Sequence, residues 1–284
     1  MHKVLATMIS AFVLLGGSIV AAQSNSTPQH SFCQRVSSGP ERIFLANTGN
    51  PNTSNQDKSE IRITYLSHAS FRIETQDGLE ISTDYTGFDG SLDIPDVATM
   101  NTIHNGHFTL TPNADIQHVL HGWKDYETKA IATHYLRIGD TIIRNVTTDF
   151  DAPHTGFRPN ENSIFVLEVA GLCIGHLGHL HKVPTDEQIA KIGLLDVVLF
   201  PVSGLRQFGF EGMQEIVRRL GANLIIPMHW YDLSEFHSFL KRIEGHYRVD
   251  GRNENSAQLS LRSLPNEPTM LILTPETSFG LFPE

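Results

Sequence analysis

The 284-residue chain carries 21 basic and 31 acidic side chains, which gives a formal net charge of −10. Hydrophobic residues make up 40% of the sequence and charged residues 18%, so the composition is too apolar for a disordered chain. Two cysteines are too few for a disulfide scaffold, and the acidic balance argues against a nucleic-acid-binding protein, which needs a basic face. The distinctive feature of the composition is its 15 histidines.

Residues 1–22 have the pattern of an export signal. Lys3 provides a short positive region, an apolar stretch runs from Val4 to Val20, and Ala21-Ala22 offers small residues at a cleavage site. An uncleaved membrane anchor is the alternative, because the apolar stretch is nearly long enough to span a bilayer. We favour cleavage, since glycines and hydroxyl side chains weaken the span. The mature protein would then be periplasmic or secreted, without stable membrane insertion.

Export would permit a disulfide between Cys33 and Cys173. Cys33 lies in a predicted N-terminal extension, residues 23–58, which is rich in turn-forming residues, whereas Cys173 lies in an apolar, strand-like run. A bridge and a buried free thiol at Cys173 both fit the sequence, because spacing does not determine pairing. Residues 59–284 are expected to form one domain.

The first part of this domain has the alternation of an antiparallel sheet with one buried face. Residues 61–81 contain three short runs in which apolar and polar side chains alternate, and Asp77-Gly78 is typical of the turn between the last two. A second hairpin is predicted over residues 163–174, with its turn at Ala170-Gly171.

The later part of the chain alternates strands with helices. Helices are predicted over residues 185–192, 211–220 and 234–243. Thr185 and Gln188 form the capping box of the first helix. Apolar runs predict strands at residues 196–200, 224–227 and 270–273. Hairpins followed by strand–helix units favour an α/β domain in which helices flank the sheets.

Several histidines fall just after predicted strands, where α/β folds gather ligands. They are His68, His104 and His107 (both after the run near Val97), His176, His179 and His229. Neutral imidazole is a common ligand of zinc and similar metals, and three or four imidazoles can build a tetrahedral site. The alternative is that many of these residues are exposed or hydrogen-bonded in the core. We adopt that interpretation for the histidines that lack a motif, which are His2, His30, His118, His134, His237 and His246.

Five segments, in the same order along the chain, carry a resemblance to a known family. Residues 63–71 (ITYLSHASF) are similar to an opening strand motif YLGHASF, residues 81–84 (ISTD) to an LTD segment, and residues 161–178 to a hairpin that leads into an HLGD motif. Residues 196–202 and 225–229 are similar to two final strands, the second of which carries a metal-binding histidine. Together they resemble the metallo-β-lactamase-fold hydrolases, in the branch that includes ascorbate-phosphate lactonases and the phospholipase D acting on N-acyl-phosphatidylethanolamine.

This resemblance implies a four-layered αβ/βα sandwich of two mixed β-sheets flanked by helices, with metal bound in a cleft between the sheets. The H-x-H-x-D-H motif of the superfamily aligns with residues 102–107, where His104 and His107 are retained. Thr102 stands in place of the first histidine, and Gly106 stands in place of the aspartate that serves a second metal.

The resemblance also implies which side chains would hold the metal. His179 stands where the HLGD motif has its bridging aspartate, so both aligned carboxylates that would offset the charge of two ions are missing. We therefore expect one ion, with zinc favoured, although iron, manganese and nickel accept the same ligand type. The expected ligands are His104, His107, His154, His179 and His229.

Two further residues are expected to assist the metal. Asp84 is expected to orient a ligand histidine through its carboxylate, unless it is a turn residue at a strand end. His68 is expected to act as a general acid or base or to bind substrate, unless it is packed and hydrogen-bonded.

Two functions remain open on this sequence. Three histidines and one open position would support an exported hydrolase that uses a metal-activated water on a small-molecule ester, lactone, amide or phosphodiester. Four histidines would close the tetrahedron, and the chain would be a non-catalytic metal- or ligand-binding relative with a degenerate site. An ordinary α/β binding protein with scattered histidines would require the five matching segments to be accidental. The oligomeric state has no sequence signal.

Overall fold

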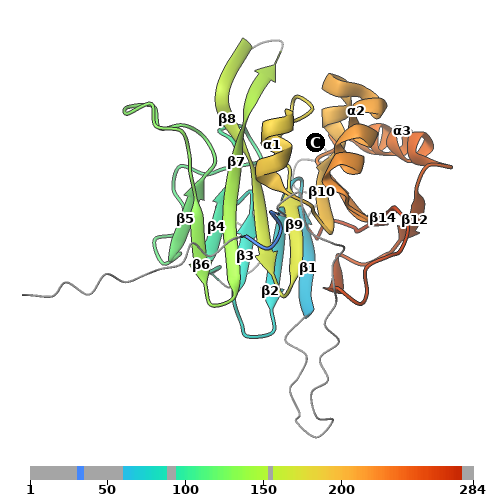
Figure 1. Ribbon diagram of the computed structural model, residues 1–284, viewed down its shortest axis with the longest axis horizontal. Helices are drawn as coiled ribbons and strands as arrows, with labels where there is room; N and C mark the ends of the chain where they lie inside the picture. The colour runs from blue at the N-terminus through green and yellow to red at the C-terminus, as the bar shows by residue number, and fades with distance from the viewer. Residues whose placement is uncertain (1–30, 35–59, 88–93, 153–155, 277–284) are drawn as a thin grey trace, which may run out of the picture. The chain divides into compact units, whose positions relative to one another are not determined.

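The computed structural model describes residues 31–34, 60–87, 94–152 and 156–276, which form two mixed β-sheets flanked by helices (Figure 1). The six-stranded sheet has the order β13-β1-β2-β3-β4-β5 and consists of β1 (Glu60–Ser67), β2 (Ser70–Thr75), β3 (Glu80–Thr83), β4 (Val97–Met100), β5 (His118–His121) and β13 (Ser256–Ser260). The eight-stranded sheet has the order β12-β14-β11-β10-β9-β8-β7-β6 and consists of β6 (Tyr135–Ile138), β7 (Thr141–Ala152), β8 (Gly156–Val169), β9 (Leu172–His176), β10 (Val197–Pro201), β11 (Leu224–Met228), β12 (Arg248–Gly251) and β14 (Thr269–Ile272). The helices are α1 (Asp186–Ile192), α2 (Leu205–Leu220), which follows the 3₁₀ turn η1 (Val202–Gly204), and α3 (Leu233–Ile243). This architecture confirms the predicted fold class.

The predicted export signal, residues 1–22, and most of the predicted extension, residues 23–58, lie outside the described residues, as does His154. Within the described ranges, no helix combines the length and the apolar character that crossing a bilayer requires.

Both predicted hairpins form where the turn residues place them. In the first, β2 pairs antiparallel with β3, and the N–H of Thr75 donates to the carbonyl of Leu79 at 3.0 Å. In the second, β8 pairs antiparallel with β9, and the turn residues Ala170 and Gly171 have φ values of 50° and 79°. Positive φ at both central residues matches the right-handed twist of the flanking strands, and Gly171 adopts it without steric cost.

The three predicted helices form, with one change of boundary. Thr185 and Gln188 make the reciprocal bonds of a capping box at the start of α1. Helix α2 begins at Leu205, ahead of the predicted start at residue 211, and Gly209 interrupts it with a φ of 69°. This glycine hid the first turn of α2 from the sequence pattern, because a residue with positive φ breaks helical periodicity.

Strand β7 was absent from the sequence prediction, because buried polar groups interrupt its apolar pattern. Arg144 lies in the middle of β7 and is buried. Its Nε donates to Glu168 Oε1 of β8 at 2.8 Å, and its other guanidinium nitrogens donate to the carbonyls of Lys191 and Ile192. A buried cation with these partners is satisfied, so a strand can carry it.

Residues 31–34 are held against the eight-stranded sheet by covalent and polar contacts. Cys33 and Cys173 form a disulfide, with a Cα–Cα distance of 5.8 Å and a sequence separation of 140 residues. The carboxylate of Glu168 accepts from Ser31 Oγ and from the N–H of Phe32, and the carbonyl of Cys33 accepts from the N–H of Leu194. The pairing that the sequence left open is therefore a bridge.

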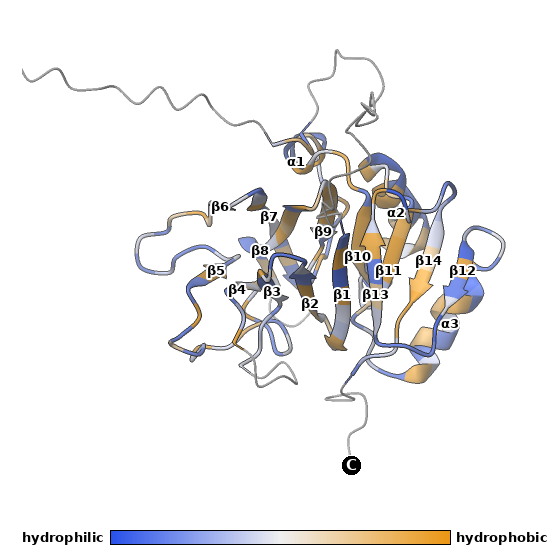
Figure 2. Ribbon diagram, turned by 90° about the horizontal axis from the view of Figure 1, so that it is seen from below, coloured by the Kyte–Doolittle hydropathy of each residue, from blue (hydrophilic) through white to orange (hydrophobic). Residues whose placement is uncertain are grey.

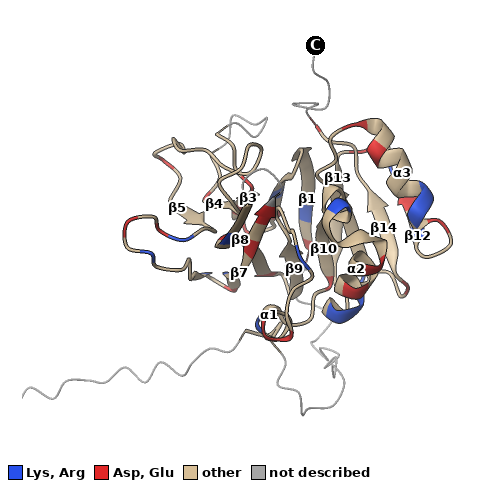
Figure 3. Ribbon diagram, turned by 90° about the horizontal axis from the view of Figure 1, so that it is seen from above, with Lys and Arg blue, Asp and Glu red and all other residues tan. Residues whose placement is uncertain are grey.

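The apolar strands of the eight-stranded sheet supply much of the core. Every residue of β10 and β11 is buried, and Figure 2 shows both strands in apolar colours. Charged residues are instead frequent on the helices, most visibly on α2 and α3 in Figure 3. The apolar strands therefore form the interior of this layer, and the amphipathic helices cover it with their charged faces toward solvent.

Parallel pairing aligns the ends of several strands at one edge of each sheet. β9, β10 and β11 pair parallel, so the residues that follow them, including His179, Ser203 and His229, emerge at a common edge. In the other sheet β3 and β4 pair parallel and are followed by Asp84 and by the segment 101–107. The two edges meet, because the N–H of His229 donates to the carbonyl of His68 at 2.7 Å.

Candidate metal centre

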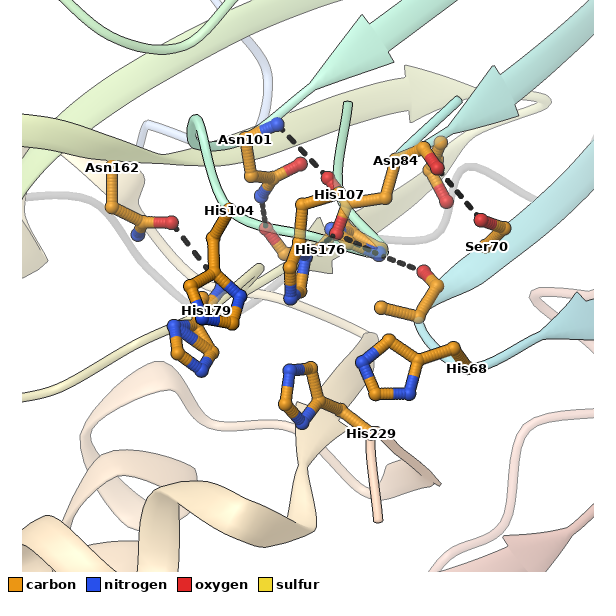
Figure 4. A network of polar contacts seen from close by, with 12 residues as sticks. His68, Ser70, Asp84, Asn101, His104, His107, Asn162, His176, His179 and His229 are labelled. Carbon is orange, nitrogen blue, oxygen red and sulfur yellow. Dashed lines mark hydrogen bonds and ion pairs between the residues drawn. The ribbon is translucent and has the colours of Figure 1, made fainter. Parts of the chain in front are cut away.

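Five histidines from both sheets gather at this junction (Figure 4). His68 lies in the turn between β1 and β2, and His104 and His107 follow β4, whereas His179 and His229 follow β9 and β11. The ring centroids of His68 and His229 are 4.1 Å apart, those of His179 and His229 are 4.7 Å apart, and those of His107 and His179 are 5.1 Å apart. The structure thus brings together four of the five predicted ligands, and with them His68.

Three residues of the site have backbone conformations that residues other than glycine rarely adopt. His68, Asp84 and His229 have φ values of 40°, 45° and 57°. Each such residue costs roughly 1–3 kcal/mol and persists only where its surroundings hold it. The hydroxyl of Tyr65 donates to the carbonyl of His68 at 2.6 Å, and the N–H of Asn101 donates to Asp84 Oδ1 at 2.9 Å. Backbone strain therefore concentrates where side chains must point into the junction.

Asp84 fixes the ring of His107. The Oδ2 atom of Asp84 lies 2.5 Å from His107 Nδ1, and both side chains are fully buried. In its carboxylate form Asp84 accepts a hydrogen bond from the Nδ1–H of His107, which leaves the lone pair on Nε2 of His107 free. Burial raises the pKa of Asp84 to about 7, while His176 and the N–H of Asn101 act in the opposite direction. The geometry is that of a carboxylate that orients a metal-binding imidazole.

A chain of two hydrogen bonds through His181 fixes the ring of His179. The Nδ1 atom of His181 lies 2.5 Å from the carbonyl oxygen of Asp151, which can only accept, so Nδ1 carries a proton. In neutral His181 the other nitrogen must then accept, and it lies 2.8 Å from His179 Nδ1. The proton on His179 therefore lies on Nδ1, and its Nε2 has a free lone pair. By the same reasoning His104, whose Nδ1 lies 3.2 Å from the carbonyl of Asn105, presents Nε2.

His229 completes the cluster from the side of β11. Its Nδ1 lies 2.6 Å from Ser203 Oγ. The Nε2 atoms of His229 and of His107 are buried and have no hydrogen-bond partner in the described part of the chain. Leaving a buried polar atom unpaired costs about 1–3 kcal/mol, so these two nitrogens indicate a missing partner.

The environment keeps these imidazoles uncharged. Burial lowers the pKa of His68 to about 4, with a contribution from His104. Burial, together with the neighbouring histidines, lowers the pKa values of His107, His179 and His229 well below the ordinary value. Neutral imidazole is the form that binds a metal ion.

Two groups of three histidines have the spacing of metal ligands. One consists of His68, His107 and His229, and the other of His104, His107 and His179. In each group the ring nitrogens lie within 4.8 Å of one another, somewhat wider than the spacing of about 3.4 Å in a tetrahedral zinc site. His107 belongs to both groups. The donors therefore fit a metal ion in chemistry and approximate position.

A cavity of about 670 Å³ adjoins the cluster and is lined by His104 and His179 among others. Phe150 and Tyr231 contribute aromatic surface, and Arg206, with Lys182, contributes positive charge. Arg206 Nε lies 2.8 Å from Glu235 Oε1, so part of this charge is already neutralised.

Sequence reasoning gave no role to His181 or Ser203, although each contacts a cluster histidine. The run His179-Leu180-His181 was the available signal, because alternate residues of an extended segment can point the same way. Ser203 had no signal, since its contact with His229 depends on the parallel pairing of β10 with β11.

Comparisons with known proteins agree with this architecture. Residues 62–229 match the Lactamase_B_3 family, described as a β-lactamase superfamily domain. A UPF0173 metal-dependent hydrolase from Methanoculleus marisnigri is 25% identical over 183 residues, which cover 60% of this chain and 81% of that protein.

Solved structures show the same fold. A Thermotoga maritima protein, described as a Zn-dependent hydrolase of the metallo-β-lactamase superfamily, is 28% identical with a TM-score of 0.53, and the match covers 75% of this chain and 98% of that one. Igni18, a metallo hydrolase from Ignicoccus hospitalis, is 16% identical with a TM-score of 0.50, and the match covers 71% of this chain and 99% of that one.

Proposed function

The chain belongs to the Lactamase_B_3 family of β-lactamase superfamily domains, and on this basis we propose that it is an exported hydrolase that uses one divalent metal ion. Zinc is the favoured ion, because all the available donors are imidazoles. The substrate is a small molecule with an ester, lactone, amide or phosphodiester bond.

The observation that carries this proposal is the pair of buried Nε2 atoms on His107 and His229, which have no hydrogen-bond partner among the described residues. A cation between them would supply the missing partner, and the surrounding neutral rings are in the form that binds it. Such an ion supplies Lewis acidity, which activates water and polarises the scissile group of the substrate.

The donor geometry supports a single ion in the cluster. His107 belongs to both groups of ligands, and its Nδ1 is engaged by Asp84. Only the single lone pair on Nε2 remains, so two ions cannot both have His107 as a ligand. The aligned carboxylates that would hold a second ion are replaced by Gly106 and His179.

The chain's own residues would bind substrate and move protons. The cavity beside His104 and His179 is large enough for a small molecule, and Phe150 and Tyr231 offer aromatic faces to an apolar substituent. His179 can pass a proton to His181 through their hydrogen bond, and the carbonyl of Asp151 keeps His181 in place. Asp84 holds His107 at a fixed angle.

Export is supported by two independent features. The N-terminal residues have the pattern of a cleavable signal, and Cys33 is disulfide-bonded to Cys173. Disulfides persist in the periplasm and outside the cell and are rare in the cytosol. The site of action proposed here is therefore periplasmic or extracellular.

A non-catalytic metal-binding relative is the second candidate. The observation that favours it is the loss of both aligned carboxylates at Gly106 and His179. The two candidates differ in turnover and not in metal binding, so one experiment separates them.

The test combines metal analysis with a panel of chromogenic ester, lactone, amide and phosphodiester substrates. We expect about one equivalent of zinc, and hydrolysis of at least one substrate class that a chelator abolishes and added zinc restores. His107→Ala should remove both metal and activity, whereas His237→Ala, an exposed histidine on α3, serves as the matched control. Full zinc occupancy without turnover would favour the second candidate, and protein free of metal would exclude both.

A further inference from the structure

The space beside Gly106 is filled by the ring of His68. A Cβ atom at Gly106 would lie 2.5 Å from Cδ2 and 3.1 Å from Nε2 of His68. Real Cβ atoms do not approach other atoms so closely, so a side chain at position 106 and the present ring of His68 exclude each other. Gly106 also has a φ of 85°, which a side chain would strain. The ring of His68 thus occupies the place that a side chain at position 106 would take.

We propose that His68 replaces in space the donor that Gly106 lacks, so that His68, His107 and His229 hold the single metal ion. His68 is then a metal ligand, a role different from the general acid or base or substrate-binding residue that the sequence suggested. The inference rests on the metal dependence proposed above, but it does not depend on which bond is hydrolysed.

The three rings have the arrangement that this assignment needs. One ring nitrogen of each lies within 4.8 Å of the other two. The ring centroid of His68 lies 4.1 Å from that of His229 and 5.6 Å from that of His107. The ring centroids of His107 and His229 are 4.8 Å apart. Figure 4 shows the rings of His68 and His229 side by side, with His107 above them.

Backbone contacts hold the turn that carries His68 next to the loop that carries His229. The carbonyl of His68 accepts from the N–H of His229 at 2.7 Å and from the hydroxyl of Tyr65 at 2.6 Å. These bonds join the turn after β1 to the loop after β11, which belong to different sheets. The strained φ values of both histidines are therefore held by the same small network.

Burial favours this group over the alternative one. Of its three rings, two have an Nε2 atom that is buried and unpartnered within the described ranges. In the group of His104, His107 and His179, only His107 has such an atom, and His104 and His179 line the open cavity. Because His107 has one free lone pair, the two groups are alternatives. His104 and His179 therefore remain free to contact substrate.

The assignment is tested by zinc affinity and by the absorption spectrum of the cobalt(II)-substituted full-length protein. We expect His68→Ala to weaken zinc binding by at least about tenfold and to change the cobalt ligand-field bands, since an imidazole leaves the ion. We expect His104→Ala to leave both readouts at the wild-type level. His237→Ala is the matched control for removal of an exposed histidine, and thermal melting of the metal-free variants verifies folding.

Gly106→Ala provides a second measurement that adds no donor and removes none. Its methyl group should displace the ring of His68 and weaken zinc binding, and combining it with His68→Ala should cause little further loss. Wild-type affinity and spectrum in His68→Ala would overturn the assignment, as would unchanged binding in a folded Gly106→Ala. Loss of zinc in His104→Ala but not in His68→Ala would assign the ion to the other group. Absence of metal from the wild-type protein would instead refute the proposed function itself.

Discussion

Single residues in this protein act through the orientation they impose on a neighbouring ring. Asp84 is the clearest case, because its carboxylate lies 2.5 Å from His107 Nδ1 and both groups are excluded from solvent. An amide in its place has nearly the same shape but no charge, and it can present its NH₂ group to Nδ1 instead of an acceptor.

Asp84→Asn should therefore weaken zinc binding by about 10- to 100-fold, the usual effect of losing a partner that orients a ligand. Competition with a fluorescent zinc chelator measures the change. Asp140→Asn, which removes an exposed carboxylate, is the control and should bind zinc as the wild type does. Equal zinc affinity in Asp84→Asn would show that the contact with His107 has no role in ligation.

Sequence patterns identified residues at the site more readily than relations between them. His104, His107, His179 and His229 follow predicted strands, and a strand end is visible in the sequence. The steric conflict between a side chain at position 106 and the ring of His68 is not visible in the sequence, because it depends on how the chain folds in three dimensions. For the same reason the contact of Ser203 with His229 could not be predicted.

At the level of secondary structure, elements with a local signal were predicted and elements stabilised by distant partners were not. Helix α1 has its capping box, and the β8–β9 hairpin has a turn whose residues accept positive φ. Strand β7 contains Arg144, whose partner Glu168 is 24 residues away. A buried ion pair of this kind makes a strand look polar in sequence although its surroundings satisfy it.

This ion pair also connects the segment 31–34 to the sheet, so its removal should destabilise the fold. Glu168 accepts from Arg144, from Ser31 Oγ and from the N–H of Phe32. Glu168→Gln keeps the shape but leaves a buried guanidinium without its counter-charge, and the free energy of unfolding should fall by about 3–5 kcal/mol.

Urea denaturation of the metal-free protein measures this change, since metal binding would otherwise mask it. Glu215→Gln is the matched control, because Glu215 forms a partly exposed pair with Arg218 and its loss should cost less than about 1 kcal/mol. A Glu168→Gln variant as stable as the control would show that the pair with Arg144 contributes nothing net.

At the level of the whole molecule, motif order was sufficient to predict the family and the fold. The family match confirms the first, and the structure confirms the second. Five segments spread between residues 63 and 229 were in the correct order, and the family match spans residues 62–229. Motif order cannot give the substrate, because the cavity is lined by residues that lie between the motifs in the sequence, such as Asp151 of β7 and Arg206 of α2.

The disulfide gives the whole molecule a dependence on its compartment. Cys33 and Cys173 enclose a loop with a sequence separation of 140 residues, and the loop-entropy model assigns such a cross-link about 5 kcal/mol of stabilisation. A reductant should therefore lower the melting temperature of the wild-type protein by roughly 10 °C or more, given the usual sensitivity of domains of this size. A Cys33→Ser/Cys173→Ser variant should melt at the same lowered temperature with or without reductant, which controls for effects of the reductant on metal binding. If reductant leaves the wild-type melting temperature unchanged, or if thiol titration of the denatured, unreduced protein finds both cysteines free, the bridge does not form in solution. The support it gives to export would then be lost, while the histidine cluster would be unaffected.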